Sequence, residues 1–360
     1  MNARRALRRQ WRKFTLTPTP PLVAGIAGLI GMAVFLQFAP KATAGGWLIA
    51  FLFWSGIPLG GLLALLIHML TGGRWGVRFA PEFLTAAAAI PLMALFAVPV
   101  LSTLPTLYPW VFGHGSVPAD VAAWYLNPPF FIGRTALAFC GWTLLVFLLP
   151  RLTGAAATVA AGVGLIFYGV MICVLGTDWV LSLEPNFVST SFGATLAFTQ
   201  LASALAWTAI VARDDGDPAF ADLGGLLLAT LLGIVYMNFM AVLVIWYGDV
   251  PERVAWFVVR THGPWPLLAW LALICGSAVP ILALFLGRWR RSPRPLRSIA
   301  GIALCGIALY DCYLVAPAFG GPALGAALLA LVTIGALFLA FMAMPWARAP
   351  LQRWSAIHGR

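Results

Sequence analysis

The stretch TDWVLSLEPNF, residues Thr177–Phe187, lies between two long apolar runs and decides how the chain can fold. It contains two carboxylates, Asp178 and Glu184, together with Trp179 and Pro185. An ionised group in the hydrocarbon core of a bilayer is energetically costly. At a membrane surface, water is within reach and Trp is favoured. The stretch therefore predicts a short surface link between two membrane spans, on the outer face.

The composition excludes a water-soluble protein. The chain has 360 residues, of which 62% are hydrophobic and 9% charged, and its mean hydropathy is +0.94. Soluble domains carry about 25% charged residues. The net charge of +11 comes largely from an N-terminal tail and from Arg288–Arg297. Because cytoplasmic loops of membrane proteins are rich in Lys and Arg, this charge indicates phospholipids as partners and no nucleic acid.

Ten apolar runs predict an all-α integral membrane protein with ten transmembrane helices, since one span needs about 20 apolar residues. Residues 1–360 are predicted to form a single transmembrane domain, with helices one to six in residues 22–212 and helices seven to ten in residues 223–344. The predicted spans are Leu22–Ala39, Trp47–Leu70, Phe83–Leu104, Pro129–Leu149, Ala155–Leu175, Ser189–Val211, Leu223–Trp246, Trp265–Leu286, Leu296–Ala316 and Ala323–Met344.

The distribution of positive charge predicts the orientation. With the N-terminus inside, the outer side holds only Lys41, Arg134, Arg253 and Arg260 of all the Lys and Arg residues. This bias predicts a bacterial inner-membrane protein with both termini in the cytoplasm. The first apolar run, Leu22–Ala39, is longer than the about 7–15 residues of a signal-peptide core, so we expect a retained first span.

The cysteines predict no redox centre in this chain. All of them lie within apolar runs, none forms C-x-x-C, and no C-x-x-C-H haem attachment motif occurs. Iron–sulfur clusters need grouped thiolates, which the sequence lacks. We therefore expect no covalently bound haem, no cluster and no metal site.

Several polar residues within the predicted spans are candidates for a proton path. Asp311 lies about 20 Å along its helix from Arg297, at 1.5 Å per residue. An intramembrane carboxylate suggests a proton relay or a ligand anchor, although it can also tie helices together. His68 ends the second span and can admit protons from the cytoplasm or be an ordinary helix-end histidine. Tyr236 and Asn238 can line a hydrated path or join helices by hydrogen bonds.

The outer face carries the candidates for a ligand site. Arg134 is placed to pair with Asp178 or Glu184, among aromatic residues of the same face. An apolar slot with carboxylates beside it suits a quinol, which releases two protons on oxidation. The alternative is an ordinary aromatic belt with a surface ion pair, which by residue type alone is the simpler account.

Five passages together resemble a known family. They are HMLTGGRWGVRFAPE (His68–Glu82), YPW (Tyr108–Trp110), WYLNPPFFIGR (Trp124–Arg134), DWVLSLEPNFVSTSFG (Asp178–Gly193) and VLVIWYGDVPERVAWFVVR (Val242–Arg260). These passages resemble the F-type membrane subunit of bacterial alternative complex III, which is similar to the membrane anchor of polysulfide reductase. The resemblance extends from about Trp47 to Trp265.

The resemblance implies ten spans, with two four-helix bundles formed by spans two to five and six to nine, plus two peripheral helices. The resemblance also implies that the chain is a subunit of a respiratory complex. Its expected partners are a sister polysulfide-reductase-like membrane subunit, an iron–sulfur protein and cytochrome c subunits, with a terminal oxidase as a further partner. Haem and iron–sulfur centres are expected only on those partners. In the family, this subunit is thought to help form a proton path or a second quinone pocket.

The chain departs from the family pattern in the outer loop and in the seventh span. Asp249 stands where the family has Asn, and Arg253 replaces the second Glu of Leu-Pro-Glu-Glu. Ala241 and Val242 occupy the neighbourhood where the family often has Gln. Both outer-loop changes alter the charge, and Asp249 therefore joins the site candidates.

The sequence thus predicts a membrane subunit of a quinol:cytochrome c or other acceptor oxidoreductase. We expect it to contribute to quinol binding or proton translocation, without being catalytic alone. Two alternatives stay open. A transporter or channel would show helices interrupted at matched positions of two halves. A membrane anchor or assembly subunit would need no ligand.

Overall fold

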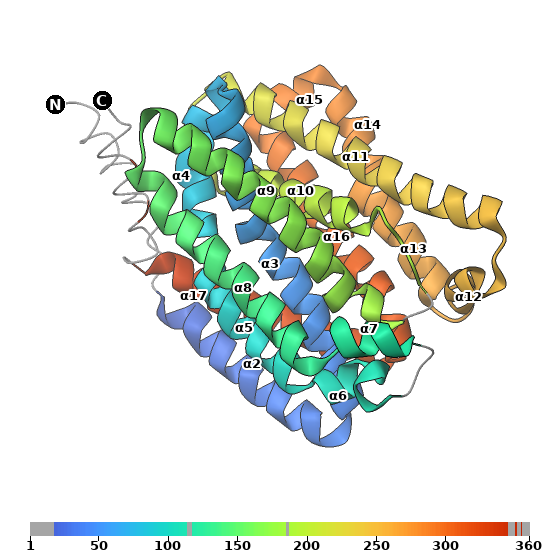
Figure 1. The fold of residues 1–360 in the computed structure, drawn as a ribbon. Helices are drawn as coiled ribbons and strands as arrows, with labels where there is room; N and C mark the ends of the chain where they lie inside the picture. The colour runs from blue at the N-terminus through green and yellow to red at the C-terminus, as the bar shows by residue number, and fades with distance from the viewer. Residues whose placement is uncertain (1–17, 114–116, 185–186, 345–349, 351–353, 355–360) are drawn as a thin grey trace.

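The computed structural model describes residues 18–113, 117–184, 187–344, 350 and 354. The described residues form helices and no strands (Figure 1). The basic N-terminal tail, Pro185, Arg348, Arg353 and Arg360 lie outside them. The helices that make up the spans are α2 (Thr19–Phe38), α3 (Pro40–Thr71), α4 (Arg74–Ala87), α5 (Ile90–Ser102), α8 (Pro128–Leu148), α9 (Gly154–Trp179), α10 (Phe192–Val211), α11 (Ala219–Gly248), α13 (Trp265–Leu273), α14 (Val279–Phe285), α16 (Pro293–Val315) and α17 (Pro322–Ala343).

Short helices form the connections. They are α6 (Leu104–Leu107), α7 (Ala119–Trp124), α12 (Pro251–Val259) and α15 (Gly287–Arg291), with 3₁₀ turns η2 (Pro109–Phe112), η3 (Leu149–Arg151), η4 (Leu181–Leu183) and η6 (Ala316–Ala318). A π-helical turn, η5 (Ile274–Ala278), joins α13 to α14. Pro280 follows this turn and has no N–H to donate, which accounts for the local change of helical register.

The prediction of an all-α membrane protein with ten spans is confirmed. Ten helical segments within the described residues are long and apolar enough to cross a membrane. The third is divided into α4 and α5 at Ala88–Ala89, just before Pro91, and the eighth contains the π-helical turn. In the predicted bundles of spans two to five and six to nine, span three is the second helix and span eight is the third. The two breaks therefore do not fall at matched positions of the two bundles.

The spans form two groups that meet along α3 and α10. In the first group, α3 packs against α4, α5 and α9, and α8 packs against α5 and α9. In the second, α10 packs against α11 and α16, α13 against α16, and α11 against α14. The remaining pair, α2 and α17, packs on α3 (Figure 1). This arrangement agrees with two four-helix bundles plus two peripheral helices.

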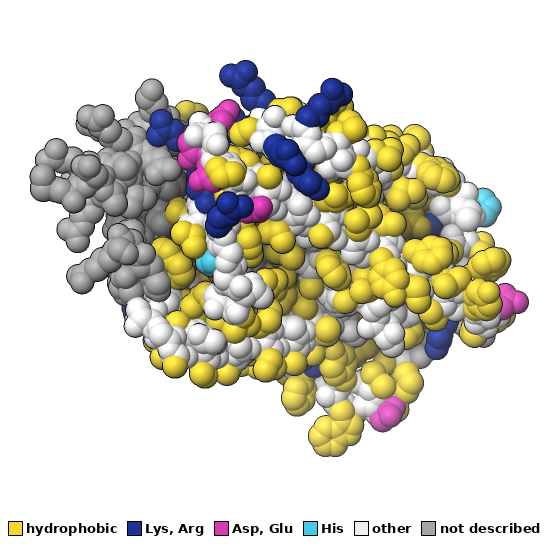
Figure 2. Space-filling view, turned by 90° about the horizontal axis from the view of Figure 1, so that it is seen from above, with side chains coloured by type: hydrophobic (Ala, Val, Ile, Leu, Met, Phe, Trp, Pro, Cys, Tyr) yellow, Lys and Arg dark blue, Asp and Glu magenta, His cyan; other side chains and the backbone are white. Residues whose placement is uncertain are grey.

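The two ends of the spans differ in character. We call the end with the links at residues 72–73, 149–153, 212–218 and 286–292 the basic end, because these links and their flanks hold most of the described Arg residues. We call the opposite end, with the longer links at residues 103–127, 180–191 and 249–264, the aromatic end, because these links contain several Trp, Tyr and Phe residues. In the view of Figure 2, most of the visible Lys and Arg side chains lie in one region beside Asp and Glu, and hydrophobic side chains cover much of the other described surface on this face.

One prediction about the defining stretch is wrong. Helix α9 continues through Trp179, so Asp178 lies in its last turn rather than in a surface link. The Asp178 side chain has no exposed surface. The helix can extend this far because Arg134 neutralises the carboxylate inside the protein, and Tyr108 donates a hydrogen bond of 3.0 Å to the carbonyl of Trp179.

The contact between the bundles depends on a glycine. Gly60 of α3 lies against the backbone of α10, and a Cβ atom there would overlap the carbonyl group of Gln200. Gln200 in turn accepts a hydrogen bond of 2.6 Å from Tyr168 of α9. Close approach of backbones at small residues is the usual way that membrane helices pack.

Gly60→Ala is expected to destabilise the protein by about 1–3 kcal/mol, because the added methyl group forces the α3–α10 crossing apart. The control is Gly162→Ala in α9, where a Cβ meets no atom within 4 Å. Unfolding of both variants in detergent, followed by circular dichroism, measures the difference. Equal stability of the two variants would contradict this account of the crossing.

Candidate functional site

The centre of the aromatic end is a buried ion pair between α8 and α9. Arg134 donates from Nε to Oδ2 of Asp178 at 2.7 Å and from Nη2 to Oδ1 at 3.0 Å. Its Nη1 donates to the carbonyl of Tyr125 at 3.0 Å, and its guanidinium carbon lies 4.1 Å from the centre of the Tyr125 ring. The predicted pairing of Arg134 is confirmed, with Asp178 as the partner and with both groups largely removed from solvent.

Aromatic residues hold this pair in place. Trp179 donates to Thr135 at 3.3 Å, which joins the ends of α8 and α9. Its ring packs edge-on against Phe51 and stacks on Phe139, at centroid distances of 5.0 and 6.0 Å. The pair is therefore fixed between rigid helices rather than on a surface belt.

Two tyrosines in the links next to the pair stay protonated at alkaline pH. Burial raises the pKa of Tyr125 to about 12, and the negative charge of Asp178 adds to this effect. Burial also raises the pKa of Tyr108 well above its ordinary value, again with a contribution from Asp178. Both phenols therefore remain hydrogen-bond donors near neutral pH.

A second arginine binds the link between α9 and α10. Arg260 donates to Oε2 of Glu184 at 2.5 Å and to the carbonyls of Trp256 and Leu314, each at 3.0 Å. It also lies 3.6 Å from the centre of the Trp256 ring. Glu184 keeps 28% of its side chain exposed, while Arg260 is buried. Sequence reasoning counted Arg260 only as an outer basic residue and missed this role.

A cavity of about 400 Å³ opens at the aromatic end, where Thr177, next to Asp178 in the chain, is one of its lining residues. Its walls come from α7 and the residues on either side of it, the end of α9, η4, the link before α10 and the start of α10. Ser182, in the wall, donates to the carbonyl of Asp178 at 2.5 Å. The other lining residues are Val117, Pro118, Val121, Leu126, Cys173, Thr177, Leu181, Phe187, Val188, Ser189, Thr190 and Gly193. The cavity is thus apolar with a few hydroxyl groups.

The structure separates two polar candidates of the seventh span. Asn238 accepts a hydrogen bond of 2.8 Å from Tyr310 and so joins α11 to α16. Tyr236, on the same helix, is 57% exposed on the outer surface of the helix bundle. Neither residue lines the cavity.

Three further candidates also lie away from the cavity. The side chain of Asp311 is buried in α16, and its carboxyl group forms no hydrogen bond or ion pair with the side chains that the structure describes. Asp249 is exposed and ends α11 with a left-handed backbone. His68 lies at the basic end, where its ring packs against Trp75 and its Nδ1 is 3.2 Å from the carbonyl oxygen of Gly72.

No group of three or more His, Cys, Asp or Glu side chains in the described part of the chain could hold a metal ion. A comparison of the sequence with models of protein families finds no match, and a comparison with curated proteins finds none either. The resemblance carried by the five motifs therefore stays a prediction.

Arg134→Met is expected to destabilise the protein by about 3–5 kcal/mol, because it leaves the Asp178 charge buried without a partner. The double variant Arg134→Met/Asp178→Leu should recover much of this loss, since no charge then stays buried. Glu184→Gln serves as the milder comparison, because Glu184 is partly exposed and Gln can still accept from Arg260. Detergent unfolding of the three variants gives the ranking, and a double variant as unstable as Arg134→Met would contradict it.

Proposed function

We propose that this chain is a membrane subunit of a quinol-oxidising respiratory complex of the alternative complex III type, and that it binds a quinol in the cavity at the aromatic end. The observation that supports this most is the cavity itself. It combines apolar walls with hydroxyl groups, and its lining residues Thr177 and Ser182 lie one position from Asp178 and two positions from Glu184 in the chain.

The lining suits the two parts of a quinol. Apolar side chains such as Leu126, Leu181 and Phe187 can contact the ring and the isoprenoid tail, as hydrophobic linings do in ligand pockets. Hydroxyl groups of Ser182 and Thr190 can exchange hydrogen bonds with the quinol oxygens.

The two carboxylates would have different roles. Oxidation of a quinol releases two electrons and two protons. Glu184 is partly exposed and lies on the link that forms the cavity wall, so it is placed to pass a proton to water. Asp178 is fully enclosed and held by two bonds from Arg134, so it fixes the wall and the local charge.

The electrons would leave to cofactors on partner subunits. We place the basic end in the cytoplasm of a bacterial inner membrane and the aromatic end at the outer face, following the distribution of Arg residues. An iron–sulfur protein and cytochrome c subunits would then cover the aromatic end, with a sister membrane subunit beside the helices. The described part of this chain would act as a binding and proton-handling subunit.

Cys173 provides a natural reporter of occupancy, because it lines the cavity. A short-chain ubiquinol or menaquinol should slow labelling of Cys173 by N-ethylmaleimide severalfold, while Cys140, exposed on α8, keeps its rate. Val188→Trp should abolish this protection by filling the cavity, whereas Val163→Trp, at an exposed position of α9 outside the cavity, should preserve it. Protection that survives Val188→Trp, or that extends to Cys140, would contradict a quinol site here.

The assignment to a complex needs its own measurement. Purification in mild detergent from native membranes should recover the chain with haem-bearing partners and with quinol-dependent reduction of cytochrome c. Recovery of the chain alone, without bound quinone, would overturn the assignment.

A further inference from the structure

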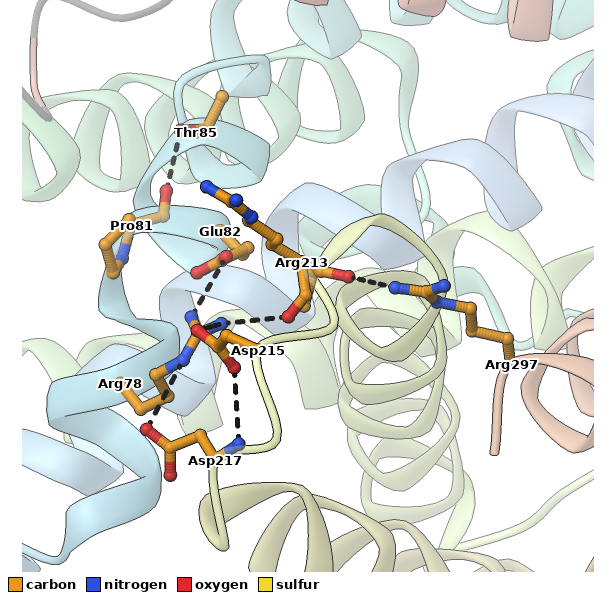
Figure 3. A network of polar contacts seen from close by, with 9 residues as sticks. Arg78, Pro81, Glu82, Thr85, Arg213, Asp215, Asp217 and Arg297 are labelled. Atoms are coloured by element: carbon orange, nitrogen blue, oxygen red, sulfur yellow. Dashed lines mark hydrogen bonds and ion pairs between the residues drawn. The ribbon is translucent and has the colours of Figure 1, made fainter. Parts of the chain in front are cut away.

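A second network of buried charge lies at the basic end, at the opposite end of α10 from the cavity (Figure 3 shows the network). Arg78 of α4 donates to Oδ2 of Asp215 at 2.9 Å and to the carbonyl of Arg213 at 3.1 Å, both in the loop between α10 and α11. Its Nε lies 3.7 Å from Asp217, and its Nη1 lies 3.4 Å from Glu82, one helical turn away. The guanidinium group of Arg78 thus contacts three carboxylates.

Glu82 is the least satisfied of the three. Only 9% of its side chain is exposed, against 37% for Asp215 and 36% for Asp217. Among the described side chains it bonds only to Arg78, from Oε1 at a long 3.4 Å, and its buried Oε2 has no hydrogen-bond partner among the described residues. A buried carboxylate oxygen without a donor is costly when ionised, and it is favourable as part of a protonated carboxyl group.

The other charges on the elements around α4 do not neutralise Glu82 in the structure. Arg74 pairs with Asp222 of α11 at 3.6 Å. Arg297 of α16 donates to the carbonyl of Ala212 at 2.6 Å. The remaining titratable or charged groups on α3 and on the α10–α11 loop are Lys41, at the far end of α3, and His68, Arg213 and Asp214. Among the described residues, only Arg78 forms an ion pair with the Glu82 carboxyl group.

We propose that Glu82 is a proton-binding site filled from the solution at the basic end, with Asp215 and Asp217 as the exposed groups through which the proton passes. The charge of Glu82 then sets how firmly Arg78 holds the α10–α11 loop. This inference stands on the network alone and does not rest on the quinol proposal.

Protonation of Glu82 is coupled to the α10–α11 loop because Glu82 and the loop share the one positive charge of Arg78. While Glu82 is protonated, Arg78 is free to bind Asp215 and the loop carbonyl. When the proton leaves, the new negative charge draws Arg78 toward Glu82, and the bonds to the loop weaken. Interacting carboxylates of this kind release their protons as a group, in steps that belong to the cluster.

Infrared difference spectroscopy of the full-length protein in nanodiscs tests the site. A carboxylic-acid C=O band should appear at low pH and disappear as the pH rises, and Glu82→Gln should remove it. Glu184→Gln, at the other end of the molecule, is the control and should preserve the band. A band that is unchanged in Glu82→Gln, or no titrating band at all, would overturn the proposal.

The variant Asp215→Asn leaves Glu82 unaltered and tests whether Glu82 and Asp215 compete for Arg78. It removes one competitor for the guanidinium and one nearby negative charge, so Glu82 should lose its proton at lower pH than in the unaltered protein. Hydrogen exchange of the amides in residues 213–217 of the unaltered protein should speed up over the pH range where the band disappears. An unshifted titration in Asp215→Asn, or exchange that does not follow the band, would show that Glu82 and the loop are independent.

Discussion

Charge that is buried in a membrane protein has to be paired, and this requirement determines how the links between the spans are held. Separation of two charges in a medium of low dielectric costs far more than in water, so a paired arginine fixes its neighbours firmly. Arg134 joins the ends of α8 and α9, Arg260 binds the link after α9, and Arg78 binds the loop after α10. Each arginine connects segments that lie far apart in the sequence or on different helices.

Both ends contain an arginine paired with carboxylates, but the two arginines differ in how many groups they contact. At the aromatic end, the Arg134–Asp178 pair is bidentate and enclosed, so it fixes the end of α9, where Thr177 lines the cavity. At the basic end, Arg78 is divided among several acceptors, and Glu82 is left with one long contact. A fixed pair suits the positioning of a ligand, whereas a shared arginine can respond to a proton.

Much of the fold could be predicted, because the length and apolarity of each span are local properties. The pairing of Arg134 was also predictable from its place on the same face as Asp178. The burial of Asp178 was not, since it depends on Arg134, Thr135 and Tyr108, which come from other segments. The role of Arg260 and the shared contacts of Arg78 could not be inferred either, because their partners are set by tertiary packing alone.

A cryo-electron microscopy structure of the complex in native lipid tests the central claim most directly. The account predicts quinone density in the cavity between Leu126, Ser182 and Phe187, with a cofactor-bearing subunit over the aromatic end. A lipid acyl chain in that cavity, together with an aromatic end that no other subunit covers, would contradict it.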